Sequence, residues 1–179
     1  MTAANDQLLS TLTVRLKCIS RNLPIGTGII YHSSELNNKI YVLTAAHNLF
    51  ENSELFTSPR KLVSVDFLDP TSNKYKSIEK EIDYSLVSTS VEEDIAILVF
   101  EKELVESLTG TLPKIRAIRD RLDMNEFILK GFPNATQGKE LVCINPTWLQ
   151  QMTESNRFQV ELKEDYLEWA VKGFSGSGV

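Results

Sequence analysis

Apolar residues alternate with polar ones over many short segments of this chain, a period-two pattern typical of strands that bury one face. Residues 11–19 show it clearly, with Leu12, Val14 and Leu16 on one side and threonine, arginine and lysine on the other. A short helical turn is expected at residues 45–50. The pattern predicts further strands at residues 26–31, 39–44, 62–67, 75–78, 82–87 and 95–100. A second half begins at residues 124–130, and its predicted strands are at 140–144, 147–152 and 158–162. The expected fold class is all-β.

Composition limits the class of protein. With 42% hydrophobic residues among 179, the chain is expected to be globular. A formal net charge of −5 with no basic stripe argues against nucleic-acid binding. No apolar run is long enough for a membrane span, and the first residues lack the pattern of a secretory signal, so a cytoplasmic location is expected. Cys18 and Cys143 are expected to be inert, mostly buried thiols, and no metal-ligand spacing is present.

Three short motifs carry the candidate chemistry, in the order histidine, aspartate, serine. His47 ends Thr-Ala-Ala-His after a predicted strand, Asp94 opens the apolar segment Asp-Ile-Ala-Ile-Leu, and Ser175 lies in Lys-Gly-Phe-Ser-Gly-Ser-Gly near the end of the sequence. A serine hydroxyl attacks a carbonyl efficiently when a base takes its proton, which an imidazole does near neutral pH. A carboxylate orients that imidazole and stabilises its protonated form. The three residues therefore indicate nucleophilic acyl transfer.

Other residues of the same types are weaker candidates for these roles. His32, the second histidine, ends a predicted hairpin strand and is interpreted as structural or exposed. Asp66 and Asp83 are rival orienting acids. Ser177 is a rival nucleophile, although Gly176 directly before it leaves no Gly-X-Ser loop in the same register.

These motifs resemble those of the trypsin-like, chymotrypsin-fold serine proteases, of the intracellular, disulfide-free bacterial type. The resemblance implies two six-stranded β-barrels, the first carrying His47 and Asp94 and the second carrying Ser175. It also implies an oxyanion hole formed by the backbone N–H groups of Gly173 and Ser175. The expected domains are residues 8–105 for the first barrel, 106–120 for a linker with some helical character from about residue 101, and 121–179 for the second barrel.

The chain also departs from the family pattern. Phe174 stands where digestive members carry an aspartate, so activation by N-terminal cleavage is not expected. Trp169, six residues before the serine, and Lys172 are the candidate cleft residues, and neither indicates a substrate preference. The sequence stops at Val179, four residues after Ser175, so the second barrel is expected to be truncated and the chain a fragment of a longer protein.

The expected function is a serine endopeptidase that forms an acyl-enzyme on Ser175 and needs no cofactor. Its partners would be a polypeptide substrate and a regulatory domain or partner protein, with the protease as a module of a larger protein. The alternative is a catalytically silent pseudoprotease that acts as a binding or scaffold module. An α/β-hydrolase fits less well, because its serine precedes its histidine and its strands alternate with helices.

Overall fold

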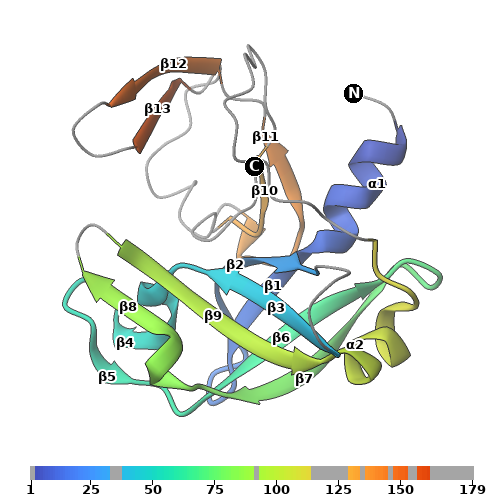
Figure 1. The fold of residues 1–179 in the computed structure, drawn as a ribbon, viewed down its shortest axis with the longest axis horizontal. Coiled ribbons are helices and arrows are strands. Elements are labelled where there is room, and N and C mark those ends of the chain that lie inside the picture. The colour runs from blue at the N-terminus through green and yellow to red at the C-terminus, as the bar shows by residue number, and fades with distance from the viewer. Residues whose placement is uncertain are drawn as a thin grey trace.

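The computed structural model describes residues 3–32, 38–90, 93–113, 129–133, 136–144, 147–152 and 157–161. Strands predominate in these ranges, as the alternating pattern predicts (Figure 1). The elements are α1 (Ala3–Leu12), β1 (Thr13–Cys18), β2 (Leu23–Tyr31), β3 (Lys39–Thr44), the 3₁₀ turn η1 (Ala46–Leu49), β4 (Phe50–Asn52), β5 (Thr57–Pro59), β6 (Leu62–Asp69), β7 (Lys74–Glu81), the 3₁₀ turn η2 (Tyr84–Leu86), β8 (Val87–Ser90), β9 (Glu93–Glu101), α2 (Lys102–Thr109), β10 (Leu129–Gly131), β11 (Val142–Ile144), β12 (Thr147–Met152) and β13 (Arg157–Glu161).

Seven antiparallel strands form the main sheet, in the order β7-β6-β1-β2-β3-β9-β8. The two outermost strands, β7 and β8, follow each other in the chain and are joined by only five residues, 82–86. This connection runs from one edge of the sheet to the other, so β7 and β8 act as two halves of one bent strand and the sheet rolls into a barrel (Figure 1). The expected N-terminal barrel is thereby confirmed.

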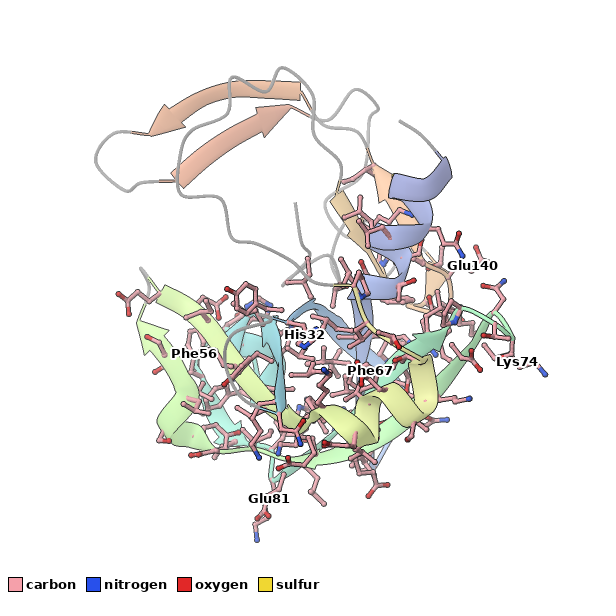
Figure 2. All side chains as sticks on the ribbon, turned by 45° about the vertical axis from the view of Figure 1, so that its right-hand side comes forward. His32, Phe56, Phe67, Lys74, Glu81 and Glu140 are labelled. Atoms are coloured by element: carbon pink, nitrogen blue, oxygen red, sulfur yellow. The ribbon has the colours of Figure 1, made fainter. Side chains whose placement is uncertain are left out.

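Alternate residues of the strands fill the interior of this barrel, because successive side chains of a strand point to opposite faces. Phe67 on β6 and Phe100 on β9 meet edge to face, with ring centroids 5.3 Å apart. Figure 2 shows Phe67 inside the barrel, whereas Lys74 and Glu81, at the two ends of β7, point outward into solvent. The fully buried side chains of the core include Val14, Leu16, Ile40, Val42, Val63, Val65, Phe67 and Ala96.

Helix α2 packs on this barrel, in the region expected to begin the linker. Val105 on α2 and Leu112 just after it are both buried in the same hydrophobic core. Residues on both sides of the expected boundary at 105 therefore contribute to the first barrel. The exact limits of the domains stay a prediction, since residues 114–128 lie outside the described ranges.

Two local expectations were wrong. Residues 3–12 form a helix, so the first strand begins at Thr13 and not at residue 11; the Thr11 and Thr13 hydroxyls donate to the carbonyls four residues earlier, as side chains at the end of a helix can do. The strand predicted at 82–87 is interrupted by η2. There the Asp83 carboxylate accepts a hydrogen bond from the Ser85 N–H (3.0 Å), a local turn that competes with strand pairing.

The second half contributes two hairpins, β10–β11 and β12–β13, close to the strands expected there. The first of them adjoins the barrel: Lys130 Nζ donates to the Ser10 hydroxyl on α1 (2.7 Å), and Phe132 is buried. The expected turn at 131–134 is present in its described part, where the Pro133 carbonyl accepts hydrogen bonds from two later N–H groups. Asn134 lies outside the described residues.

Both cysteines are described, and no disulfide joins them. Cys18 is buried, as expected, but Cys143, on β11, is exposed. In the part of the chain that the structure describes, no helix is long and apolar enough to cross a membrane.

Candidate active site

His47 lies on η1, one turn of 3₁₀ helix that begins just after β3 ends. The turn begins as the Asn48 N–H donates to the Ala45 carbonyl (3.2 Å). Ala45 and Ala46 are both buried. Ala46 belongs to the hydrophobic core of the barrel, so the turn is packed against that core.

Asp94 is the second residue of β9, the strand that pairs with β3. The last pair of that antiparallel ladder is Thr44 with Ala96. His47, just after the end of β3, and Asp94, near the start of β9, therefore lie at the same end of this strand pair. The register of two adjacent strands brings together residues that are 47 positions apart in the sequence.

Asp94 binds His47 at two points. Its Oδ1 accepts a hydrogen bond from the His47 backbone N–H (2.9 Å), and its Oδ2 lies 2.5 Å from Nδ1 of the ring. Because an ionised carboxylate only accepts hydrogen bonds, this contact places the ring proton on Nδ1 and makes Nε2 the basic nitrogen. One carboxylate thus fixes the position of the turn, the orientation of the ring and its tautomer.

The pair is only partly shielded from water. The His47 side chain is 29% exposed and that of Asp94 is 35% exposed. Exposed pairs of this kind contribute little to stability, about 0–1 kcal/mol. The imidazole therefore remains accessible to a reacting group while its orientation is held.

The structure separates the rival acids from this histidine. Asp66 is buried on β6 and binds Arg15 and Lys17, and Asp83 caps η2. His32 is buried at the end of β2, consistent with a structural role. Of the acids weighed from the sequence, Asp94 is the one that contacts His47.

The remaining predicted site residues lie outside the described residues. These are Ser175 and its rival Ser177, the oxyanion residue Gly173, and the cleft candidates Trp169 and Lys172. Their roles stay predictions. Within the described ranges, no group of three or more His, Cys, Asp or Glu side chains is arranged to hold a metal ion.

Sequence reasoning missed a buried polar group directly behind the histidine. The Asn48 side chain is 3% exposed and donates from Nδ2 to the Thr44 hydroxyl (3.0 Å). A second polar residue beside His47, in a turn that otherwise carries Ala46 and Leu49, was the available signal. Its partner could not be identified without the turn geometry.

No protein-family model matches this sequence, and the search of curated proteins also finds no match. The fold does have solved counterparts. A serine endoprotease from Yersinia pestis superposes with a TM-score of 0.61 over 99% of this chain, at 15% identity. This chain has the chymotrypsin fold. Deg5 is similar over 99% of this chain and 80% of its own, with a TM-score of 0.58 and 16% identity.

A third structure of this fold is an inactive form of Rv3671c from M. tuberculosis. It matches 94% of this chain and 68% of its own length, with a TM-score of 0.51 and 15% identity. The chain spans about half, 53%, of the Yersinia structure. These similarities establish the chymotrypsin fold, and the chemistry must be argued from the residues of this chain.

Proposed function

We propose that this chain is the protease module of a serine endopeptidase, with His47, Asp94 and Ser175 as its catalytic residues. The observation that carries the proposal is the two-point contact of Asp94 with His47 at one edge of a chymotrypsin-type barrel. A partly exposed histidine held in this tautomer, with Nε2 as its basic nitrogen, is what a serine nucleophile requires of its base. The proteases among the solved structures of this fold support the same assignment.

The proposed reaction begins with attack of the Ser175 hydroxyl on a peptide carbonyl. Nε2 of His47 takes the hydroxyl proton, and Asp94 stabilises the imidazolium that forms. His47 then returns the proton to the leaving amine, which leaves an acyl group on Ser175. In the second half of the cycle, His47 takes a proton from the water that attacks the acyl carbon. It then gives this proton to Ser175 Oγ as the bond between the acyl carbon and Oγ breaks, which releases the carboxylic acid product and regenerates the serine.

The negative charge that develops on the carbonyl oxygen needs fixed hydrogen-bond donors. The proposed donors are the backbone N–H groups of Gly173 and Ser175. Removing one such donor typically costs about 3 kcal/mol of transition-state stabilisation. Trp169 and Lys172 are proposed to lie along the substrate cleft.

The proposed substrate is a polypeptide, and no cofactor takes part in the reaction. A regulatory domain or partner protein is proposed to control the module. The cytoplasmic location likewise stays a prediction from the sequence.

The test is labelling with a fluorophosphonate probe, which reacts only with an activated serine, followed by mapping of the adduct by mass spectrometry. The longest natural form and the 179-residue chain would be treated in parallel. We expect labelling at Ser175 that is lost in His47→Ala and retained in Ser177→Ala, which is the matched control. Labelling at Ser177 would show that the nucleophile is misassigned, and no labelling in either form would contradict the proposal and favour a pseudoprotease that binds without turnover.

A further inference from the structure

The four-residue turn that carries His47 has an unusual support. Its N-cap residue is Ala45, whose side chain cannot accept a hydrogen bond from the first N–H groups of the turn. Asp94 supplies one acceptor from the solvent side, through the His47 N–H. On the opposite, buried side, the turn is attached to the barrel through the side chain of Asn48.

Asn48 begins a series of buried hydrogen bonds. Its Nδ2 donates to the Thr44 hydroxyl (3.0 Å), and that hydroxyl donates to the Thr27 carbonyl on β2 (2.7 Å). All three residues are at most 3% exposed. Each bond in such a series polarises the next, and the low local dielectric makes an unsatisfied member costly. The series therefore holds the amide of Asn48 in one orientation.

Gly26 on β2 provides the space for this amide. A Cβ at residue 26 would lie 2.2 Å from Asn48 Nδ2 and 2.4 Å from Asn48 Cγ, well inside van der Waals contact. Only glycine can therefore stand at position 26 while the amide keeps this place. The glycine is required for close approach of a side chain from another element.

The series also reaches the second half of the chain. The Thr27 hydroxyl accepts a hydrogen bond from the Phe132 N–H (3.0 Å), and Phe132 is buried. Four segments, η1, β3, β2 and the residues after β10, are thus joined behind the histidine by side chains of Asn48, Thr44 and Thr27. The turn that carries His47 is thus linked to Phe132 through buried hydrogen bonds.

We propose that Asn48 is a positioning residue for His47, supported by the Thr44 hydroxyl and by the space at Gly26. The proposal rests on the proposed protease function, for which His47 is the base. Asn48 acts through the backbone of the turn: it fixes where the imidazole stands, while Asp94 fixes how the imidazole is rotated. A displacement of about 1 Å in such a group can reduce turnover about 100-fold.

Three variants disturb the same contact by different means. Asn48→Ala removes the amide, Gly26→Ala pushes it away, and Thr44→Val removes its acceptor. Thr44→Ser keeps the hydroxyl and is the conservative rescue. Val105→Ala, a core truncation on α2, is the control for a general loss of stability.

Two readouts apply to each variant in the longest natural form: kcat on a fluorescently labelled unfolded protein, and hydrogen exchange of the His47 backbone amide relative to amides of β6. We expect Asn48→Ala to lower kcat about 100-fold with little change in KM. The His47 amide should exchange about tenfold faster relative to β6, as the loss of one hydrogen bond implies. Gly26→Ala and Thr44→Val should share these changes, and Thr44→Ser should largely restore both values.

The proposal is overturned if Asn48→Ala and Gly26→Ala behave like Val105→Ala, so that hydrogen exchange of the His47 amide and of the β6 amides becomes faster by the same factor. It is also overturned if Thr44→Ser is as impaired as Thr44→Val. Should Asn48→Ala not fold, the Thr44 pair and Gly26→Ala decide the question. If the wild-type protein shows no turnover, the protease function fails, and the exchange of the His47 amide alone tests the positioning role.

Discussion

Two aspartates on the same barrel bind their partners in opposite ways. Asp94 on β9 is 35% exposed, and both its oxygens bind a single residue, His47. Asp66 on β6 is 1% exposed and binds three residues: Oδ2 accepts from Arg15 Nε (2.9 Å) and lies 2.7 Å from Nη2, while Oδ1 faces Lys17 Nζ (3.1 Å) and accepts from the Ser77 hydroxyl (2.6 Å).

The cluster around Asp66 is structural. The Arg15 guanidinium lies 5.1 Å from the Tyr75 ring centroid and 5.3 Å from that of Phe132, and Nη1 donates to the Gly138 carbonyl (3.0 Å). This arrangement joins the first barrel to the residues after β10. Because Asp66 is buried and both its oxygens are occupied, the carboxylate is unsuited to taking part in a reaction.

The pair of Asp94 and His47 lacks this enclosure. It is expected to contribute little to stability, and the oriented imidazole stays 29% exposed. Burial and the number of partners thus distinguish a carboxylate that holds the fold together from one that serves chemistry.

The largest effect is expected from the proposed nucleophile and base. Ser175→Ala and His47→Ala should each lower kcat by about 10⁶, and the double variant should lose no more, because such residues act as a unit. Turnover of a labelled unfolded protein measures this. The urea midpoint should stay nearly unchanged. Additive losses in the double variant would contradict a shared mechanism.

Asp94→Asn should lower kcat by about 10⁴, because an amide favours the wrong tautomer of His47. The free energy of unfolding should change little, since the pair is partly exposed. Steady-state kinetics and urea denaturation measure the two quantities on one preparation. Full activity in Asp94→Asn, together with an inactive Asp83→Asn, would show that the orienting acid is misassigned.

Asp66→Asn should lower the free energy of unfolding and leave kcat of the folded protein nearly unchanged, the reverse of Asp94→Asn. Removing this buried charge leaves Arg15 and Lys17, whose side chains are 15% and 18% exposed, without their counter-ion. Breaking a fully buried pair typically costs about 3–5 kcal/mol, and because water partly solvates these two cations we expect a loss at the lower end of that range. Urea denaturation measures this loss. Ser77→Ala, which removes one neutral donor to the same carboxylate, is the matched control and should cost about 1 kcal/mol. An Asp66→Asn variant as stable as the wild type would remove the distinction drawn between the two aspartates.

The smallest effect concerns acid stability. The Lys76 ammonium beside Asp69 (2.9 Å), together with the Ser72 hydroxyl and the Thr71 N–H, holds the pKa of the Asp69 carboxyl well below its usual range. Because this pKa is lower in the folded state, the ionised carboxylate stabilises the fold at neutral pH. That contribution is lost as the pH falls below about 4, where an unfolded aspartate is protonated, and on through the folded-state pKa.

Asp69→Asn should therefore be less stable than the wild type at pH 7, and the difference should shrink in acid. Urea midpoints measured across the acid range would show this convergence. Glu79→Gln, at an exposed position on the neighbouring strand, serves as the control and should show no convergence. A constant difference at all pH values would rule out the carboxylate as its source.

The sequence predicted the barrel well where the alternation was strong, as in residues 39–44 and 62–67, which are strands in the structure. It failed where a local hydrogen bond competes with pairing, as at Asp83, and where a short helix precedes a strand, as at α1. The helix carries Leu8, Leu9 and Leu12 among polar residues. This segment is too short for the period of its apolar residues to distinguish a helix from a strand.

The class of fold and the residue types available for chemistry follow from the amino-acid sequence alone, because the period of apolar residues and a histidine after two alanines are local features. Three further facts emerge from the folded chain: Asp94 is the aspartate that meets His47, cations surround Asp66, and Asn48 lies over Gly26. Each of these contacts joins residues on different elements, 47 positions apart for His47 and Asp94 and 51 for Arg15 and Asp66. They depend on strand register and burial, which are properties of the folded barrel as a whole.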